Sequence, residues 1–128
     1  MRQAMLAVGL LVLAACAGVT ARNEVLLPAM EVAWVGVKAD VEYGIDILVL
    51  QGDIEMANDA RSALAEFDDV FMTGDRERLP ATQWPALADL AAQGIQMRVV
   101  IGEIGPGVAE SKMERLRMFH DALVEVLR

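Results

Sequence analysis

A repeat of 50 residues is the feature that most constrains how this chain can fold. A shift of 50 positions aligns the only two tryptophans, Trp34 and Trp84. Six of the 21 residues from position 34 to position 54 are identical to the residues 50 positions later. The other five identical pairs are Gly44 and Gly94, Ile45 and Ile95, Val49 and Val99, Gly52 and Gly102, and Ile54 and Ile104. Repeats of roughly 20–50 residues usually mean that one supersecondary unit has been copied. Two hairpins that are similar without a duplication would give the same pattern.

The register continues after a two-residue insertion. Phe67 then aligns with Phe119, at an offset of 52. The insertion falls in the segment 105–107, Gly-Pro-Gly, where turn-forming residues cluster. Each copy of the repeat therefore consists of two stretches of chain that match those of the other copy, joined by a turn.

The spacing of apolar residues is typical of a helical hairpin in each unit, because they recur every three or four positions. In hairpin 28–73, Pro28 suits the first turn of a helix that ends at Gly52, and a second helix is expected over 55–72. In hairpin 80–127, Thr82 is a candidate N-cap of a third helix ending at Gly102, and a fourth is expected over 108–127. The inward-facing residues are expected to be Met30, Trp34, Val37, Val41, Ile45, Leu48, Ala60, Leu64, Phe67, Phe71, Trp84, Leu87, Ala91, Ile95, Val99, Met113, Leu116, Phe119, Leu123 and Leu127.

Two tandem hairpins predict an all-α fold, an antiparallel four-helix bundle in one domain over 28–128, in which each hairpin covers the other's apolar face. Gly44 and Gly94 lie inside the first and third expected helices, where a glycine costs about 1 kcal/mol relative to alanine. Either the helix backbones approach closely at these glycines, or each helix breaks there. The apolar stripe stays in phase across both glycines and favours continuous helices.

The N-terminal residues have the layout of a bacterial secretion signal. A charged start at Arg2 precedes an apolar core, and small residues follow up to the single cysteine, Cys16. The sequence Leu-Ala-Ala-Cys over 13–16 resembles the lipobox of bacterial lipoprotein precursors, a resemblance confined to residues 1–17. It implies a signal peptide over 1–15, cleavage before Cys16, and lipid on that cysteine. Three acyl chains would make the membrane anchor effectively permanent.

The same resemblance implies a location in the cell. Ala17 follows the cysteine at the position where lipoproteins retained at the inner membrane carry Asp, so an outer-membrane protein facing the periplasm is expected. Residues 16–27 are then the lipidated cysteine and a tether. An uncleaved transmembrane helix over 4–21 is the alternative, since this stretch is apolar and just long enough to span a bilayer.

Charge excludes one class of partner. The chain has 19 acidic and 11 basic side chains and a net charge of −8, and loss of Arg2 with the signal would make it −9. Such a charge repels phosphate backbones, so no nucleic acid partner is expected. No cysteine besides Cys16 could form a disulfide, so the fold is expected to depend on packing alone.

Side chains suited to catalysis are scarce. Serine occurs only at Ser62 and Ser111 and histidine only at His120, so no catalytic residues and no enzyme are expected. Di-metal bundles need Glu-x-x-His pairs, but Arg117 stands three residues before the histidine, so no metal site is expected. His120 and Met30 could in principle ligate haem. A half-buried structural histidine on the seam of the last helix is the expected role.

Two hypotheses for function remain. The first is a non-enzymatic envelope lipoprotein without a cofactor, anchored through Cys16, that acts as a periplasm-facing interaction or accessory module and docks on another envelope protein. The alternative is a carrier of a small or haem-like ligand held inside the helical bundle.

Overall fold

The computed structural model describes the backbone of residues 15–73 and 80–127 and the side chains of residues 28–72 and 80–126. The described residues form four α-helices, a short 3-10 turn and no strand, which confirms the expected all-α fold. The helices are α1 (Ala15–Leu50), α2 (Ile54–Thr73), α3 (Trp84–Val100) and α4 (Pro106–Leu127), and the 3-10 turn η2 (Ala81–Gln83) precedes α3.

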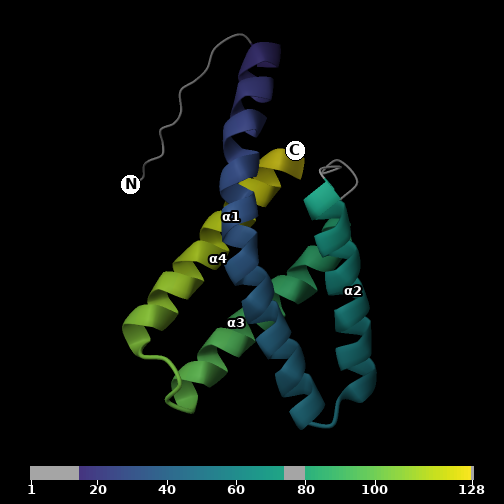
Figure 1. Cartoon of the computed structure of the whole chain (residues 1–128), viewed down its shortest axis with the longest axis vertical. Helices are drawn as coiled ribbons and strands as arrows, with labels where there is room; N and C mark the ends of the chain where they lie inside the picture. Colours follow the sequence, from purple (N-terminus) through teal and green to yellow (C-terminus); the bar gives the residue numbers. More distant parts are fainter. Residues whose placement is uncertain (1–14, 74–79, 128) are drawn as a thin grey trace.

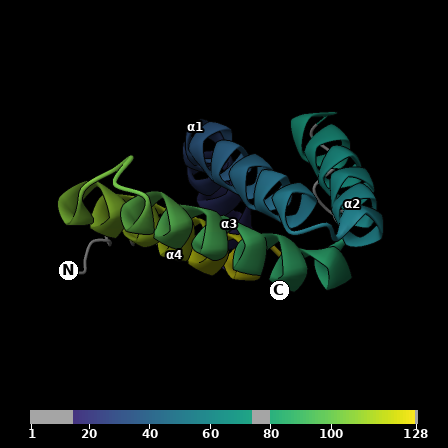
Figure 2. The same cartoon turned by 90° about the horizontal axis from the view of Figure 1, so that it is seen from below.

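The helices form two antiparallel hairpins that stack as two layers (Figures 1 and 2). Hairpin 1 is α1 with α2, and hairpin 2 is α3 with α4. The most extensive contact between any two helices is made by α1 and α3, which cross near the middle of the molecule. The expected four-helix bundle is thus confirmed, with hairpins that cross each other at an angle.

Two of the expected helix starts were wrong. Helix α1 begins at Ala15, so Pro28 lies inside it and the expected tether, 16–27, is helical. Proline removes one backbone hydrogen bond there, but residues 15–27 are rich in Ala and Leu, which favour helix. Thr82 does not cap α3, because it lies within η2. Helix α3 begins at Trp84, with Pro85 in its first turn, where the missing N–H has no helical partner to lose.

The ends of α1 and α3 were predicted correctly. Gly52 and Gly102 have φ angles of 85° and 77°, in the left-handed region that favours glycine. In both turns the glycine N–H donates to the carbonyl three residues earlier, at 3.0 Å. The N–H of the following residue donates to the carbonyl five residues earlier, at 2.9 Å after Gly52 and 2.8 Å after Gly102. The two helices therefore end in the same Schellman motif.

Gly44 and Gly94 lie where α1 and α3 cross, and both helices are continuous through them. A Cβ on Gly44 would overlap the carbonyl oxygen of Leu90, and a Cβ on Gly94 would lie 2.7 Å from the carbonyl oxygen of Asp40. The prediction of close backbone approach is confirmed. Because Gly94 and Leu90 stand 50 positions after Gly44 and Asp40, the contacts are reciprocal. Reciprocal contacts are those of a two-fold axis, here an approximate one between the hairpins.

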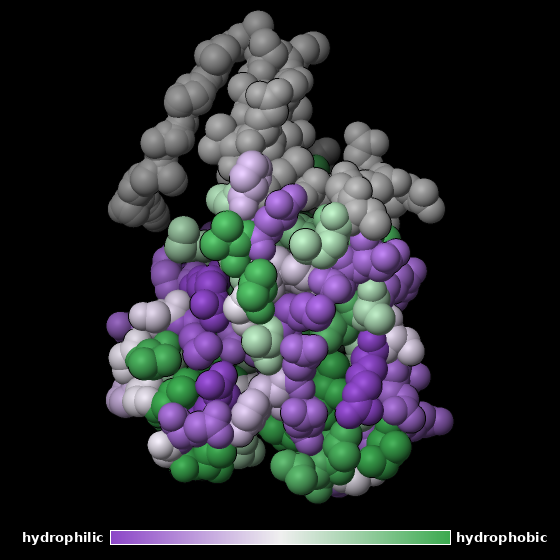
Figure 3. Space-filling view, in the orientation of Figure 1, coloured by the Kyte–Doolittle hydropathy of each residue, from purple (hydrophilic) through white to green (hydrophobic). Residues whose placement is uncertain are grey.

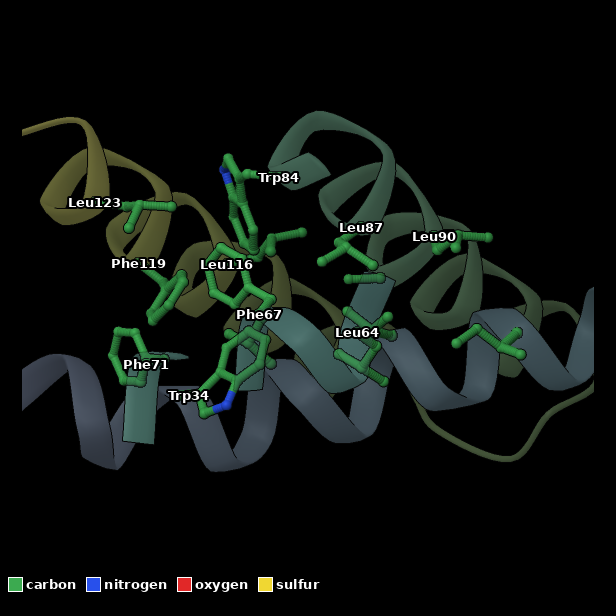
Figure 4. Packing of buried hydrophobic residues seen from close by; sticks show 14 of the residues in the cluster. Trp34, Leu64, Phe67, Phe71, Trp84, Leu87, Leu90, Leu116, Phe119 and Leu123 are labelled. Carbon is green, nitrogen blue, oxygen red and sulfur yellow. The ribbon is translucent and has the colours of Figure 1, made fainter. Parts of the chain in front are cut away.

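The aromatic core repeats with the same symmetry (Figure 4). Trp34 stacks on Phe119 of the other hairpin, with ring centroids 5.4 Å apart, and Trp84 stacks on Phe67, at 5.7 Å. Within each hairpin the tryptophan is tilted against its own phenylalanine, at 5.0 Å for Trp34 and 5.2 Å for Trp84. Of the expected inward-facing residues, Ala60, Val99 and Met113 are half-buried, Leu127 lies outside the described side chains, and the others are buried.

The described helices do not include a candidate membrane span. Within residues 15–73 and 80–127, none of the helices combines the length and the apolar character that crossing a bilayer requires. Most of the alternative span, 4–21, and nearly all of the signal peptide, 1–15, lie outside the described residues.

The crossing gives the first testable prediction. Gly44→Ala should lower the free energy of unfolding by about 2 kcal/mol or more, because the added methyl meets backbone that cannot move aside. Gly36→Ala is the matched control. Its methyl would meet only the mobile end of Arg115, so the free energy should change by less than about 1 kcal/mol. Urea unfolding followed by tryptophan fluorescence measures both, and equal effects would contradict the close approach.

Candidate functional site

Asp40 is the one buried charged residue among the described side chains, with an exposed fraction of 1%. It lies on α1, one turn before Gly44 and next to the helix crossing. Burying a carboxylate is costly unless it is paired, so the charge of Asp40 requires cations nearby.

Three cations from the other hairpin surround Asp40. Arg98 Nη1 and Lys112 Nζ lie 3.5 and 3.4 Å from its Oδ1, and Arg115 Nη2 lies 3.3 Å from its Oδ2. We call these four residues the charge cluster. Its distances exceed the roughly 2.7–2.9 Å of strong charge-assisted hydrogen bonds. Arg115 Nε is also buried without an acceptor among the described residues, so the cluster is only loosely satisfied.

The cluster continues to the surface through Arg98. The Nε of Arg98 donates to Glu103 Oε1 at 3.0 Å, and its guanidinium lies 5.1 Å from the centre of the Tyr43 ring. The Tyr43 hydroxyl donates to Glu103 Oε2 at 3.3 Å. Burial and the Glu103 carboxylate raise the pKa of Tyr43. The end of hairpin 2 is thereby bonded to α1.

The approximate two-fold axis relates the charge cluster to apolar residues. At the offsets of 50 and 52, Asp40 corresponds to Leu90 and Arg98 to Leu48, while Lys112 and Arg115 correspond to alanines. Both leucines are buried and both alanines are packed against the core. We call these residues, Leu90, Leu48, Ala60 and Ala63, the apolar counterpart. The matching positions of the two halves are therefore charged in one case and apolar in the other.

The tryptophan hydrogen bonds are a second pair of matched contacts. Trp34 Nε1 donates to Asp68 Oδ1 at 2.7 Å, and Lys38 Nζ donates to Asp68 Oδ2 at 3.0 Å. At the position matching Asp68, His120 accepts from Trp84: the distance from Trp84 Nε1 to His120 Nδ1 is 2.8 Å. Both buried indoles are thus satisfied by the residue after the core phenylalanine.

His120 lies at the expected place, at the edge of α4, but it is exposed and not half-buried. The reason is that its ring covers the outer edge of Trp84, with centroids 6.3 Å apart. Met30, its suggested partner for haem, is buried at an exposed fraction of 2%. Aromatic rings of both hairpins pack against one another between the layers (Figure 4).

The other candidate residues are dispersed. Cys16 lies in the first turn of α1, and its side chain is outside the described residues. Ser62 on α2 and Ser111 on α4 are both exposed. Within the described ranges, no three His, Cys, Asp or Glu side chains are placed to hold a metal ion.

Exposed apolar side chains occur at both hairpin tips, and others, such as Val32 and Val35 on α1, lie elsewhere on the surface (Figure 3). The tip of hairpin 1 exposes Leu50 and Ile54, at fractions of 86% and 50%, and the tip of hairpin 2 exposes Val100 and Ile101, at 79% and 57%. Both tips lie at the end of the molecule opposite the start of α1, where Cys16 is located (Figure 1).

No family model, no curated protein and no solved structure matches this chain. The charge cluster and the tips were not identified from the sequence. The cluster could have been found by aligning the repeats, because Asp40 then falls on an apolar position, Leu90.

The hydrogen bonds of Asp68 give a pH prediction. Burial raises the pKa of Asp68, but the hydrogen bonds from Trp34 and Lys38 lower it by more, so its pKa lies below the ordinary value. The stabilisation is therefore present above the unfolded pKa, near about 4, and is lost as the pH falls through the folded pKa. Wild type should exceed Asp68→Asn in stability at pH 6, and the difference should shrink below about pH 4. Chemical unfolding at each pH tests this, with Asp69→Asn, an exposed neighbour, as control.

Proposed function

We propose that this chain is a non-enzymatic, lipid-anchored module of the bacterial cell envelope that binds another envelope protein through its hairpin tips. The observation that carries the proposal is the placing of exposed apolar side chains on both tips, at the end of the fold farthest from Cys16. Lipid on Cys16 would hold one end at the membrane and present the tips away from it. Exposed apolar clusters commonly mark protein interaction sites.

The repetition of the tips supports this assignment. Leu50 and Val100 are matching positions in the repeat, and both are among the most exposed apolar residues of the described chain. Exposure of one apolar residue is ordinary, but the same exposure at one matching position in both copies gives each tip an apolar side chain at the same end of the molecule. A single partner could contact both.

The alternative, a carrier of a small or haem-like ligand, is less well supported. The region between the layers is filled by side chains, and His120 uses Nδ1 to accept the Trp84 N–H. We therefore put forward the interaction module alone, with attachment at the outer membrane facing the periplasm.

Anchoring is tested by Cys16→Ser, which removes the only thiol of the chain. The variant should lack acyl chains by mass spectrometry of the intact protein and should move from the membrane fraction to the soluble fraction, unless the uncleaved signal holds it. Cys16→Ala serves as a second variant without a hydroxyl. Unchanged mass and unchanged fractionation would contradict the lipobox interpretation.

Docking is tested by a photoreactive amino acid at Leu50, with crosslinking in intact cells. Val100→Asp should reduce capture of the partner at least about tenfold, because a charge would have to be buried in the contact. Val32→Asp is the matched control, since Val32 is equally exposed, at 79%, but lies on α1 away from the tips. Equal capture by both variants would contradict docking through the tips, even if Cys16 proved to be lipidated.

A further inference from the structure

The contact between the two hairpins could also form between two identical hairpins from different chains. Its contacts are reciprocal about the approximate two-fold axis, as in a dimer of identical subunits. Two copies of hairpin 1 from different chains, or two copies of hairpin 2, would offer each other the same crossing glycines and the same aromatic rings. The covalent link between the hairpins favours pairing within one chain, and a further determinant is needed to select between hairpins of different chains.

We infer that the charge cluster determines this pairing: it makes hairpin 1 pack on hairpin 2 and prevents either hairpin from packing on a second copy of itself. The cluster has the required distribution. Asp40 belongs to hairpin 1, and the three cations belong to hairpin 2. Only a mixed pair places the carboxylate against the cations.

The pairs of like hairpins would bury unmatched charge. Two copies of hairpin 1 would place each Asp40 against the other's Leu48, Ala60 and Ala63, with no cation. Two copies of hairpin 2 would place Arg98, Lys112 and Arg115 of each copy around the other's Leu90, without the Asp40 carboxylate, and only Arg98 would keep an acidic partner, Glu103 of its own hairpin. A charge buried without its partner is strongly destabilising, so both arrangements are disfavoured.

The apolar counterpart suggests that apolar residues can replace these charges. At the matching positions on the other side of the axis the chain has two buried leucines and two alanines packed against the core. Buried ion clusters are often no more stabilising than apolar residues of similar size, and this one has long distances and an unsatisfied Arg115 Nε. Selection of the partner is therefore its distinguishing contribution. This inference is independent of the proposed function.

The first experiment replaces the four residues of the charge cluster, in the full chain, by the residues of the apolar counterpart. The four-residue variant Asp40→Leu, Arg98→Leu, Lys112→Ala, Arg115→Ala should fold with the helix content of wild type and melt at the same or a higher temperature. The variant that keeps Asp40 but carries the other three changes should melt roughly 15 °C lower or more, because the carboxylate is left alone. If the four-residue variant melts as low as the three-residue variant, the cluster is a requirement of the fold and the inference is overturned.

The second experiment asks whether the charges select partners between chains. Asp40→Leu leaves hairpin 2 with unmatched cations, and the three-residue variant leaves hairpin 1 with an unmatched carboxylate. By exchanging hairpins, one chain of each kind forms a dimer in which both mismatches are removed. The two full-length variants, distinguished by isotopic labelling, are unfolded together in urea, refolded and analysed by native mass spectrometry.

The mixed dimer should make up more than about 90% of all dimers, compared with the half expected from random association, and it should melt near wild type. Wild-type chains refolded with their labelled copies give the background of hairpin exchange. A random distribution of dimers, or refolding of the mixture without mixed dimers above that background, would overturn the inference.

Discussion

The crossing of α1 and α3 at Gly44 and Gly94 is the constraint on which the rest of the structure depends. The absence of two side chains lets the helix backbones touch, which brings the hairpins close enough for both tryptophans to stack on phenylalanines of the opposite layer. The glycines reduce helix propensity, and close packing of the layers offsets that loss. A wider separation would leave gaps throughout the aromatic core.

The repeat allows structural and specialised positions to be separated within one chain. Positions that match in both halves make the crossing, the helix ends and the stacked rings. Other matching positions carry different side chains. Asp68 and His120 each accept a hydrogen bond from a buried tryptophan, and Asp40 and Leu90 occupy matching buried positions. The second copy therefore acts as an internal reference. It identifies the positions at which one half has charged groups and the other half has apolar ones.

Much of the fold was predictable from the sequence because helical spacing and terminal glycines are local signals. The inner faces of all four helices and the ends of α1 and α3 were predicted correctly. The start of α1 was not, because a proline that usually marks a first turn lies inside this helix. The burial of Asp40 was missed since it depends on Arg98, Lys112 and Arg115, residues 58 to 75 positions away, whose approach is decided by the angle between the layers.

The uninterrupted helix before the core has a mechanical consequence. Met30 is the first buried residue among the described side chains, and it stands fourteen positions after Cys16, which as helix is a distance of about 21 Å. With a disordered linker of similar length, the distance between the membrane and the folded domain would vary widely, whereas a helix keeps this distance nearly constant. Under the proposed anchoring, the number of helical turns between Cys16 and the core then determines how far from the lipid surface the folded domain is held.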